Sequence, residues 1–224
     1  MCGRYSVAPV GTAEDIAELF EAINRAELRP RYNVAPSQDA PVVRLDRHAE
    51  REIVSVRWGL VPFFARDAKV GFANINARGE TVATSRMFRE AFERRRCLVI
   101  ATGFYEWQKT GAKTKQPYNI EVVGSPVFAM AGIWERWKPA SGEPMSSFAI
   151  ITTEAATSIS AIHERMPVIL PRDAWPLWLD PDASPERAQA LLRPFPGDGL
   201  LAYPVSPRVG SHVNDDPACI APLA

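Results

Sequence analysis

The second residue of the chain is a cysteine, and this position allows a chemistry that an internal cysteine lacks. Methionine aminopeptidases remove the initiator methionine when the next side chain is small, so we expect the mature chain to begin at Cys2. A terminal cysteine carries an amine and a thiol on adjacent carbons, and reference pKa values of about 8 and about 8.5 leave part of each group unprotonated near neutral pH. An aldehyde can condense with the amine to an imine, on which the thiol then closes a thiazolidine ring.

Three polar segments supply groups that would assist such a reaction. Glu106 follows the apolar run CLVIATGFY, where a carboxyl either faces water or lies in an apolar cleft with the raised pKa of a proton donor. His163, in IHERMPVIL, has an ordinary pKa of about 6.5 that suits proton transfer, although a lone histidine is more often structural. Asn76, in NINARGET, can donate and accept hydrogen bonds to a sugar, but the segment is equally typical of a polar turn before a helix.

Arginines interleaved with prolines and aromatic residues form a fourth pattern. It covers RYNVAPSQ at 31–38 and RWGLVPFFA at 57–65. Proteins use such combinations to stack nucleobases while they hold the backbone phosphates. Aromatic strands are also ordinary core, and for Trp58 we expect burial in the core.

The overall composition narrows the class of protein. The 26 basic and 26 acidic residues cancel, which excludes a protein that coats nucleic acid through bulk charge. Most of the basic residues are arginine, a bias that suits a phosphodiester ligand and that a GC-rich genome would also produce. The three scattered cysteines form no zinc spacing and fit a reducing compartment, and the common nucleotide-binding fingerprints are absent. Without a membrane-spanning stretch or a signal peptide, an intracellular protein is expected.

Hydrophobic patterning predicts many strands and few helices. Helices are expected at 12–23, where Thr12 and Asp15 can form a capping start, and at 85–95, 172–179 and 184–192. Short apolar runs indicate strands, joined by hairpin-like loops in QKTGAKTKQP and KPASGEP. The runs are PVVRL, EIVSVRWGLVPFF, CLVIATGFYEW, YNIEVV, VFAMAGIWERW and SFAIITT. We therefore predict one α+β domain over residues 1–224, with a barrel-like, mostly antiparallel sheet and a few peripheral helices.

The chain contains seven short motifs in this order: MCGRY, RYNVAP, WGLVP, NARGET, TSRMF, GFYEW and HERMP. Together they resemble the SOS response-associated peptidase family, also called the abasic-site processing proteins. The tail VSPRVGSHVNDDP is similar to the closing segment of that family. The resemblance implies a barrel-like antiparallel α+β domain. It also implies a role in DNA damage repair, in which an abasic site in single-stranded DNA is captured as a thiazolidine on the N-terminal cysteine.

Carried over by motif, the resemblance makes Cys2 the nucleophile, Asn76 the residue that positions sugar and amine, and Glu106 with His163 the proton-transfer pair. Six further residues are expected along the DNA, and these are Arg4, Arg78 and Arg86 near phosphates, Asn33 and Pro36 at the channel edge, and Phe64 stacking on a base. The implied chemistry needs no cofactor and no metal. We expect a monomer of the cytoplasm, associated with the nucleoid when bound to single-stranded DNA, and not with a membrane.

Two other readings stay open. The family name implies peptidase activity, and Cys2, His163 and Glu106 also match the thiol, base and orienting group of an N-terminal-nucleophile cysteine peptidase or amidohydrolase. A lyase activity on the abasic strand would use the same groups. Alternatively, the protein binds single-stranded DNA without catalysis, in which case loss of Cys2 would leave salt-sensitive binding intact.

Overall fold

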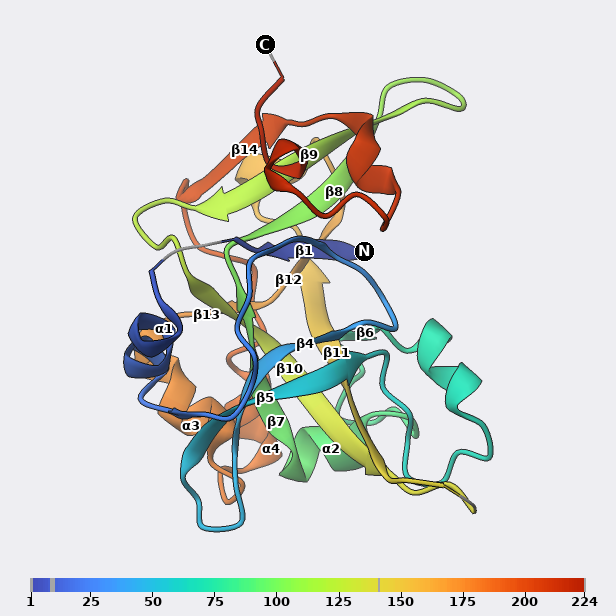
Figure 1. Ribbon diagram of the computed structural model, residues 1–224, viewed down its shortest axis with the longest axis vertical. Coiled ribbons are helices and arrows are strands. Elements are labelled where there is room, and N and C mark those ends of the chain that lie inside the picture. Colours follow the sequence, from blue (N-terminus) through green and yellow to red (C-terminus); the bar gives the residue numbers. More distant parts are fainter. Residues whose placement is uncertain (1, 9–10, 141, 224) are drawn as a thin grey trace.

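A closed ring of five strands forms the centre of the computed structural model, which describes residues 2–8, 11–140 and 142–223 (Figure 1). The order around the ring is β5, β4, β7, β10, β11 and back to β5. Four of the pairings are antiparallel, and the closing pair, β11 with β5, is parallel. This confirms the predicted barrel-like, mostly antiparallel α+β fold. The strands are β4 (Asp39–Leu45), β5 (Arg51–Trp58), β7 (Arg96–Ala101), β10 (Phe128–Trp137) and β11 (Met145–Glu154).

A second, wholly antiparallel sheet lies above the barrel in Figure 1. Its strand order is β14 (Leu200–Pro204), β9 (Lys115–Val122), β8 (Gly103–Lys109), β1 (Arg4–Val7) and β3 (Arg31–Val34). The apolar run that was expected as one strand, 97–107, in fact divides between the two sheets. Thr102 stands at the break, where its backbone N–H donates to Ser6 O at 2.9 Å. The break carries the end of the run, with Glu106, out of the barrel and alongside β1.

Four short strands complete the sheets: β2 (Ile23–Asn24), β6 (Asn76–Arg78), β12 (Arg165–Pro167) and β13 (Ile169–Leu170). Strand β6 runs parallel to β11, and β12 pairs with the end of the same strand. Neither β3 nor β6 is among the apolar runs that were expected as strands. Both strands are only three or four residues long and rich in polar groups, so local alternation gives them no signal.

The helices are short and peripheral, as expected. Helix α1 (Ala13–Phe20) begins with the predicted capping box, since Thr12 and Asp15 bond each other's backbone N–H groups. Its buried Phe20 stacks on Trp175, with ring centroids 4.6 Å apart. The other three expected helices are shorter than their patterns, and the expected helix at 85–95 begins only at residue 89. They are α2 (Arg89–Arg94), α3 (Trp175–Leu179) and α4 (Pro185–Gln189), with 3₁₀ turns η1 (Ala68–Ala73), η2 (Thr157–Ile159), η3 (Arg172–Ala174), η4 (Pro207–Gly210) and η5 (Pro217–Cys219).

The hydrophobic core is continuous from the barrel interior to the underside of the second sheet. Tyr5 of β1 and Phe104 of β8 belong to the same buried cluster as the barrel residues. Trp58 is fully buried, as expected, and packs edge-on against Tyr5 with centroids 5.1 Å apart. None of the helices in the described part of the chain is long and apolar enough to cross a membrane.

The buried guanidinium of Arg96 binds backbone carbonyls at the C-terminal ends of two helices, α2 and α3. The side chain is only 4% exposed. The last carbonyls of a helix have no partner within the helix, and a buried cation with five N–H donors can satisfy several of them at once. The guanidinium donates to the backbone carbonyls of Phe92, Glu93, Trp178, Asp180 and Ala183.

Replacing Arg96 with methionine is expected to lower the free energy of unfolding by about 3 kcal/mol, because several buried carbonyls lose their donors together. Chemical denaturation of the two proteins measures the difference. The matched control is Arg94→Met, since Arg94 is exposed on α2. Equal stability losses in both variants would contradict the role given to Arg96.

Candidate active site

Cys2 lies in a fully buried position just before β1. Its carbonyl accepts a hydrogen bond from the Asn76 amide, with Nδ2 and O 2.7 Å apart, and its Sγ lies 3.6 Å from Arg4 O. Asn76 begins β6, so the parallel pairing of β6 with β11 fixes where this amide points. The buried Oδ1 of Asn76 has no hydrogen-bond partner among the described residues. One end of the amide therefore holds the cysteine, and the other can accept a hydrogen bond.

Glu106 and His163 approach each other beside the cysteine. Glu106 lies on β8, the neighbour of β1, and its carboxyl is 2% exposed. Its Oε2 is 3.8 Å from Nε2 of His163, which precedes β12. Two backbone groups of Arg165 face His163 Nδ1, the N–H at 3.0 Å and the carbonyl oxygen at 3.2 Å. The shorter contact is satisfied by the neutral tautomer that carries its proton on Nε2. In that tautomer the imidazole presents an N–H towards the carboxyl.

Burial shifts the proton affinities of all three titratable groups. It raises the pKa of Glu106 to about 7, so that the carboxyl can exchange a proton near neutral pH. It lowers the pKa of His163, which favours the neutral ring. Burial, with the nearby Glu106 carboxylate, raises the pKa of the Cys2 thiol and keeps it protonated. The arrangement combines a neutral thiol with a carboxylic acid poised to donate.

An ion pair joins the two polar motifs that flank this cluster. Arg165 contacts Glu80 through both carboxylate oxygens, at 2.5 and 2.9 Å. The same guanidinium donates to Thr152 O at 2.8 Å, which ties the pair to β11. Because the Arg165 backbone orients His163, the ion pair also fixes the position of the imidazole.

Arg4 and Asn33, both expected to contact DNA, bind the tail of the chain in this structure. The Arg4 guanidinium donates to Asn33 Oδ1 at 3.1 Å, to Val209 O at 2.8 Å and to Gly210 O at 3.1 Å. Asn33 is fully buried, and its amide donates to the carbonyls of Val209, Ser211 and Asn214. These contacts hold the tail segment 206–216 against β1 and β3, and the buried Asn33 presents no surface to a DNA strand in this conformation.

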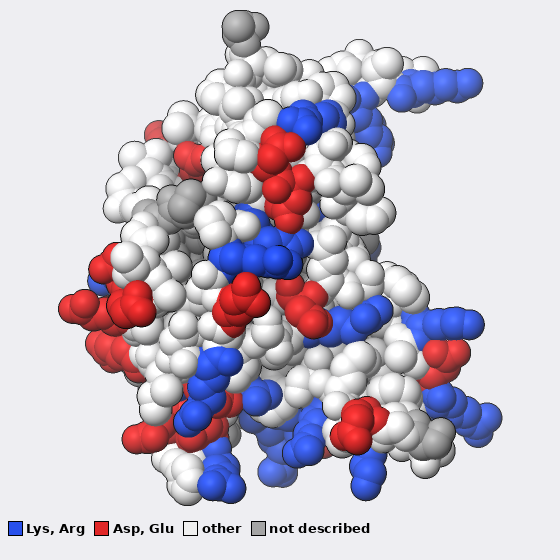
Figure 2. Space-filling view, viewed as in Figure 1, with Lys and Arg blue, Asp and Glu red and all other residues white. Residues whose placement is uncertain are grey.

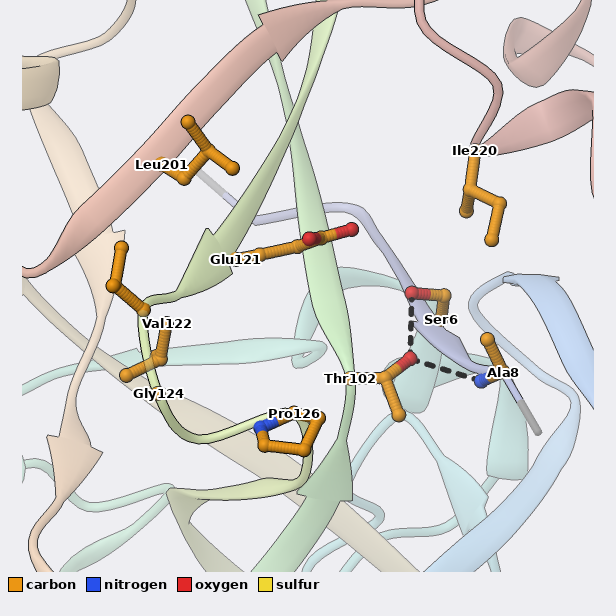
Figure 3. Close-up of a pocket in the computed structure, with 10 residues that line it drawn as sticks. Ser6, Ala8, Thr102, Glu121, Val122, Gly124, Pro126, Leu201 and Ile220 are labelled. Atoms are coloured by element: carbon orange, nitrogen blue, oxygen red, sulfur yellow. Dashed lines mark hydrogen bonds between the residues drawn. The ribbon is translucent and has the colours of Figure 1, made fainter. Parts of the chain in front are cut away.

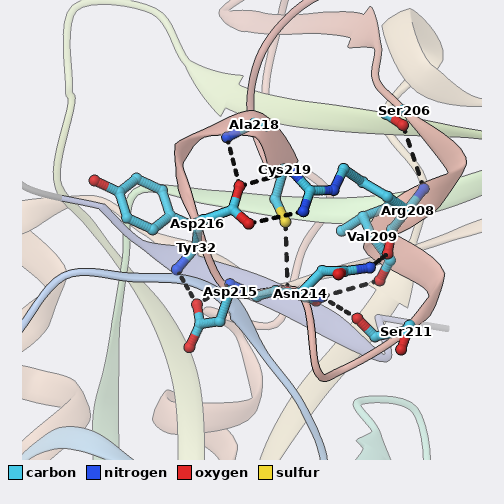
Figure 4. Close-up of polar contacts among 11 residues, drawn as sticks. Tyr32, Ser206, Arg208, Val209, Ser211, Asn214, Asp215, Asp216, Ala218 and Cys219 are labelled. Carbon is cyan, nitrogen blue, oxygen red and sulfur yellow. Dashed lines mark hydrogen bonds and ion pairs between the residues drawn. The ribbon is translucent and has the colours of Figure 1, made fainter.

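Acidic residues of the tail add further contacts to β3 and within the tail (Figure 4). Asp215 accepts hydrogen bonds from the backbone N–H groups of Tyr32 and Asn33, at 2.5 and 2.9 Å, and from Arg31 Nε at 2.5 Å. Asp216 forms a two-point ion pair with Arg208 inside the tail. The segment VSPRVGSHVNDDP therefore packs against the start of β1, only a few residues from Cys2.

The remaining expected DNA contacts are more accessible. Arg78 and Arg86 are exposed, and Pro36 is half-buried in the turn that follows β3. Phe64 is 41% exposed, and the Arg86 guanidinium lies 5.2 Å from its ring centroid. The loop between β5 and β6 thus offers an exposed aromatic ring beside a positive charge.

The same loop exposes two further phenylalanines, Phe63 and Phe72, which are 52% and 62% exposed. Close approach of two glycines folds the loop back on itself, because a Cβ built on Gly71 would lie 2.5 Å from Gly59 O. Phe72 was missed as a functional candidate because GFA is typical of an ordinary apolar segment. Its exposure depends on the fold of the loop and has no signal in the sequence.

A cavity of about 470 Å³ lies between β1, β8, β9 and β14 and contains none of the four residues expected to be catalytic (Figure 3). Its hydroxyl groups are already paired, since Ser6 Oγ and Thr102 Oγ1 are 3.1 Å apart and Thr102 Oγ1 accepts from Ala8 N. Within residues 2–8, 11–140 and 142–223, no three His, Cys, Asp or Glu side chains are grouped to hold a metal ion.

Comparison with known proteins identifies the family of the chain. A family model described as "SOS response associated peptidase (SRAP)" matches residues 1–212. The chain is 40% identical over 219 residues to "Abasic site processing protein YoaM" of Bacillus subtilis, covering 96% of this chain and 95% of that protein. It is 36% identical over 235 residues to "Abasic site processing protein HMCES" of Gallus gallus, covering 91% and 69%.

Solved structures share the fold. A protein from Bacteroides thetaiotaomicron superimposes with a TM-score of 0.89 at 29% identity, and each chain is covered completely. A protein from Bordetella bronchiseptica gives a TM-score of 0.77 at 28% identity, covering 92% of this chain and 100% of that one. The barrel with its second sheet is therefore an architecture common to distant relatives.

Proposed function

The chain belongs to the SOS response-associated peptidase family, and on this premise we propose that it processes abasic sites by covalent capture of single-stranded DNA on Cys2. The observation that carries the proposal is the meeting of Cys2, Asn76, Glu106 and His163, which come from four separate segments of the chain. Relatives named abasic site processing proteins support the same target.

The reaction begins once removal of Met1 has freed the Cys2 amine. The amine nitrogen attacks the aldehyde carbon of the open-chain deoxyribose and forms a carbinolamine. Protonated Glu106 gives its proton to the hydroxyl group, which leaves as water, and a protonated imine remains. The Cys2 sulfur then bonds to the imine carbon while the Glu106 carboxylate takes the thiol proton, and the imine nitrogen becomes the neutral ring N–H of the thiazolidine. One water is released in all, and Glu106 ends the reaction protonated again.

The contacts of the site assign a part to each neighbouring residue. Asn76 anchors the Cys2 carbonyl, while its Oδ1 accepts a hydrogen bond from the amine or the sugar. The Nε2–H of His163 faces Glu106 and stabilises the carboxylate after it has given up its proton. Glu106, rather than His163, is therefore the first proton donor in this scheme.

The raised pKa of Cys2 favours aldehyde capture over peptidase chemistry. A cysteine peptidase needs a thiolate, and its catalytic cysteine has a lowered pKa. Burial and Glu106 act on Cys2 in the opposite direction. A neutral thiol still adds to an imine, because the electrophile is activated by protonation and the carboxylate beside it can remove the thiol proton.

Single-strand selectivity would come from the loop between β5 and β6. Bases stack on exposed aromatic rings only when they are free of a partner strand. Phe63, Phe64 and Phe72 offer such rings, and Arg78 and Arg86 offer positive charges for the phosphates. We expect this damaged-DNA role to be carried out by a monomer in the cytoplasm, at the nucleoid.

Incubation of the purified chain with a single-stranded oligonucleotide that contains one abasic site tests the proposal. We expect an adduct that survives denaturing electrophoresis, with an intact mass equal to the two partners less Met1 and one water. An oligonucleotide whose abasic aldehyde has been reduced to an alcohol is the matched control and should give no adduct. An adduct that retained Met1, or that formed equally with the alcohol, would refute the mechanism.

A further inference from the structure

Lysine is rare in this chain, and three of its five lysines lie within one hairpin. Lys109 ends β8, Lys115 begins β9 and Lys113 lies in the turn between them. All three are exposed, and no acidic residue occurs from 107 to 120. A segment of +3 charge is therefore concentrated at one tip of a molecule whose net charge is zero.

The lysines of this hairpin repel one another. Lys109 and Lys115 are directly opposite in the antiparallel register, where like charges destabilise a strand pair. None of the three has an ion-pair partner among the residues that the structure describes. The turn is nevertheless closed by hydrogen bonds between Thr110 and Thr114. The hairpin thus holds unneutralised charge in a defined arrangement that an anionic partner would relieve.

The hairpin is attached to the candidate active site. Glu106 and Lys109 lie on the same strand, and Gln108 between them donates to Ala161 O at 3.1 Å, in the segment that leads to His163. Burial sets the direction of the pKa shifts of Glu106 and His163, and the positive charge of Lys115 acts on both groups as a smaller, lowering influence. Lys115 is therefore within electrostatic range of the proton-transfer pair.

Figures 1 and 2 show the setting of the hairpin. It projects at the upper right of Figure 1, in light green, and β1 lies below it, close to the end marked N. The outline of the space-filling view in Figure 2 has an indentation below this projection. In Figure 2 blue side chains lie along this projection and also along the lower edge of the indentation. Exposed basic residues of the β5–β6 loop, of β6 itself and of the turn after it are Arg66, Lys69, Arg78 and Arg86.

We infer that the β8–β9 hairpin binds the phosphodiester backbone of the captured strand, on the side of the site away from the exposed phenylalanines. This inference rests on the proposed function and adds a second contact to it. The strand would pass between two basic edges, with aromatic rings on one edge and lysines on the other. The hairpin supplies charge without base contacts, so its contribution is independent of sequence.

The test measures non-covalent binding of an undamaged single-stranded oligonucleotide as a function of salt concentration. For single strands the slope of log K against log salt changes by about 0.7 for each phosphate contact. The variant K109Q/K113Q/K115Q should therefore have a slope smaller in magnitude by about 2, and an affinity lower by about one order of magnitude near physiological salt. Charge-retaining K109R/K113R/K115R should keep the wild-type slope.

A matched control removes three positive charges at a distance from the hairpin. The exposed residues Arg47, on the β4–β5 turn, Arg136, on β10, and Lys138, just after β10, supply these charges, and R47Q/R136Q/K138Q should keep the wild-type slope. An unchanged slope in the hairpin variant overturns the inference, as does an equal change in both glutamine variants, which would reflect bulk charge alone.

The salt-dependence experiment and the adduct experiment can fail independently of each other. If capture on Cys2 is correct, the hairpin glutamine variant still forms the covalent adduct at low salt and high protein concentration. If capture is wrong, no protein forms the adduct, but the salt slope still shows whether the hairpin binds phosphates.

Discussion

Cys2→Ala is expected to abolish the stable adduct with abasic single-stranded DNA. Alanine is small enough for Met1 to be removed, so the variant keeps the terminal amine and still forms an imine with the aldehyde. Without sulfur the ring cannot close, and the imine hydrolyses. Covalent product should then appear only when a hydride donor such as borohydride is added to reduce the imine.

Gel electrophoresis under denaturing conditions, with and without the hydride donor, measures both species. The Cys97→Ala protein is the control, because Cys97 is also fully buried but lies on barrel strand β7. It should form the adduct at the wild-type level. Undiminished, hydride-independent adduct from Cys2→Ala would show that another nucleophile captures the DNA, whereas an adduct lost in both variants would indicate a folding defect.

Glu106→Gln is expected to slow adduct formation by about 10²- to 10⁴-fold, since glutamine cannot give a proton to the leaving hydroxyl. In the proposed mechanism the donor is the protonated carboxyl, whose pKa burial raises to about 7. The rate of capture relative to the variant should therefore be highest below pH 7 and fall as the pH rises through it. Single-turnover rates over a pH series measure this dependence.

The same substitution should change stability in a pH-dependent way. The folded-state pKa of about 7 lies above the unfolded reference of 4.5, so the folded protein binds this proton more tightly. That contribution to stability is complete below pH 4.5 and is lost as the pH rises through 7. Relative to Glu106→Gln, the wild-type protein should lose about 3 kcal/mol of unfolding free energy over this range.

Glu143→Gln is the matched control for both measurements, because Glu143 is exposed in the β10–β11 turn. It should leave the rate profile and the stability profile unchanged. A Glu106→Gln protein with wild-type rates at every pH would remove Glu106 from the mechanism. A stability difference independent of pH would show that the carboxyl does not titrate in the folded state with a raised pKa.

The predicted strands and hairpins were recovered where local pattern and burial agree. The apolar runs at 41–45 and 147–153 lie within β4 and β11, and the run at 127–137 matches β10 to within one residue. Both predicted hairpin loops join neighbouring strands. The pattern failed where a run changed sheets at Thr102, because alternation records burial and not the sheet to which a strand belongs. It also failed for β3 and β6, whose short polar sequences become strands only through their partners.

The contacts that Arg4 and Asn33 make with the tail show the same limit of local sequence patterns. In the sequence, an arginine or asparagine that binds a phosphate cannot be told from one that binds a backbone carbonyl. The decisive partners, Val209 and Gly210 for Arg4, lie about 200 residues away in the sequence. Only the folded chain brings the tail to β1 and occupies these donors.

By itself, the sequence determined the chemical groups: a cysteine at position 2, a carboxyl after an apolar run, one histidine in a polar motif, and the motifs that indicate the family. It also determined the capping box of α1 and most of the strands, since these depend on neighbouring residues. The tertiary structure decided which groups meet, how deeply Glu106 is buried and whether the arginines are free. The pKa of Glu106 and the contacts of the arginines depend on atoms that are distant in the sequence, and the local spacing of residues does not reveal those atoms.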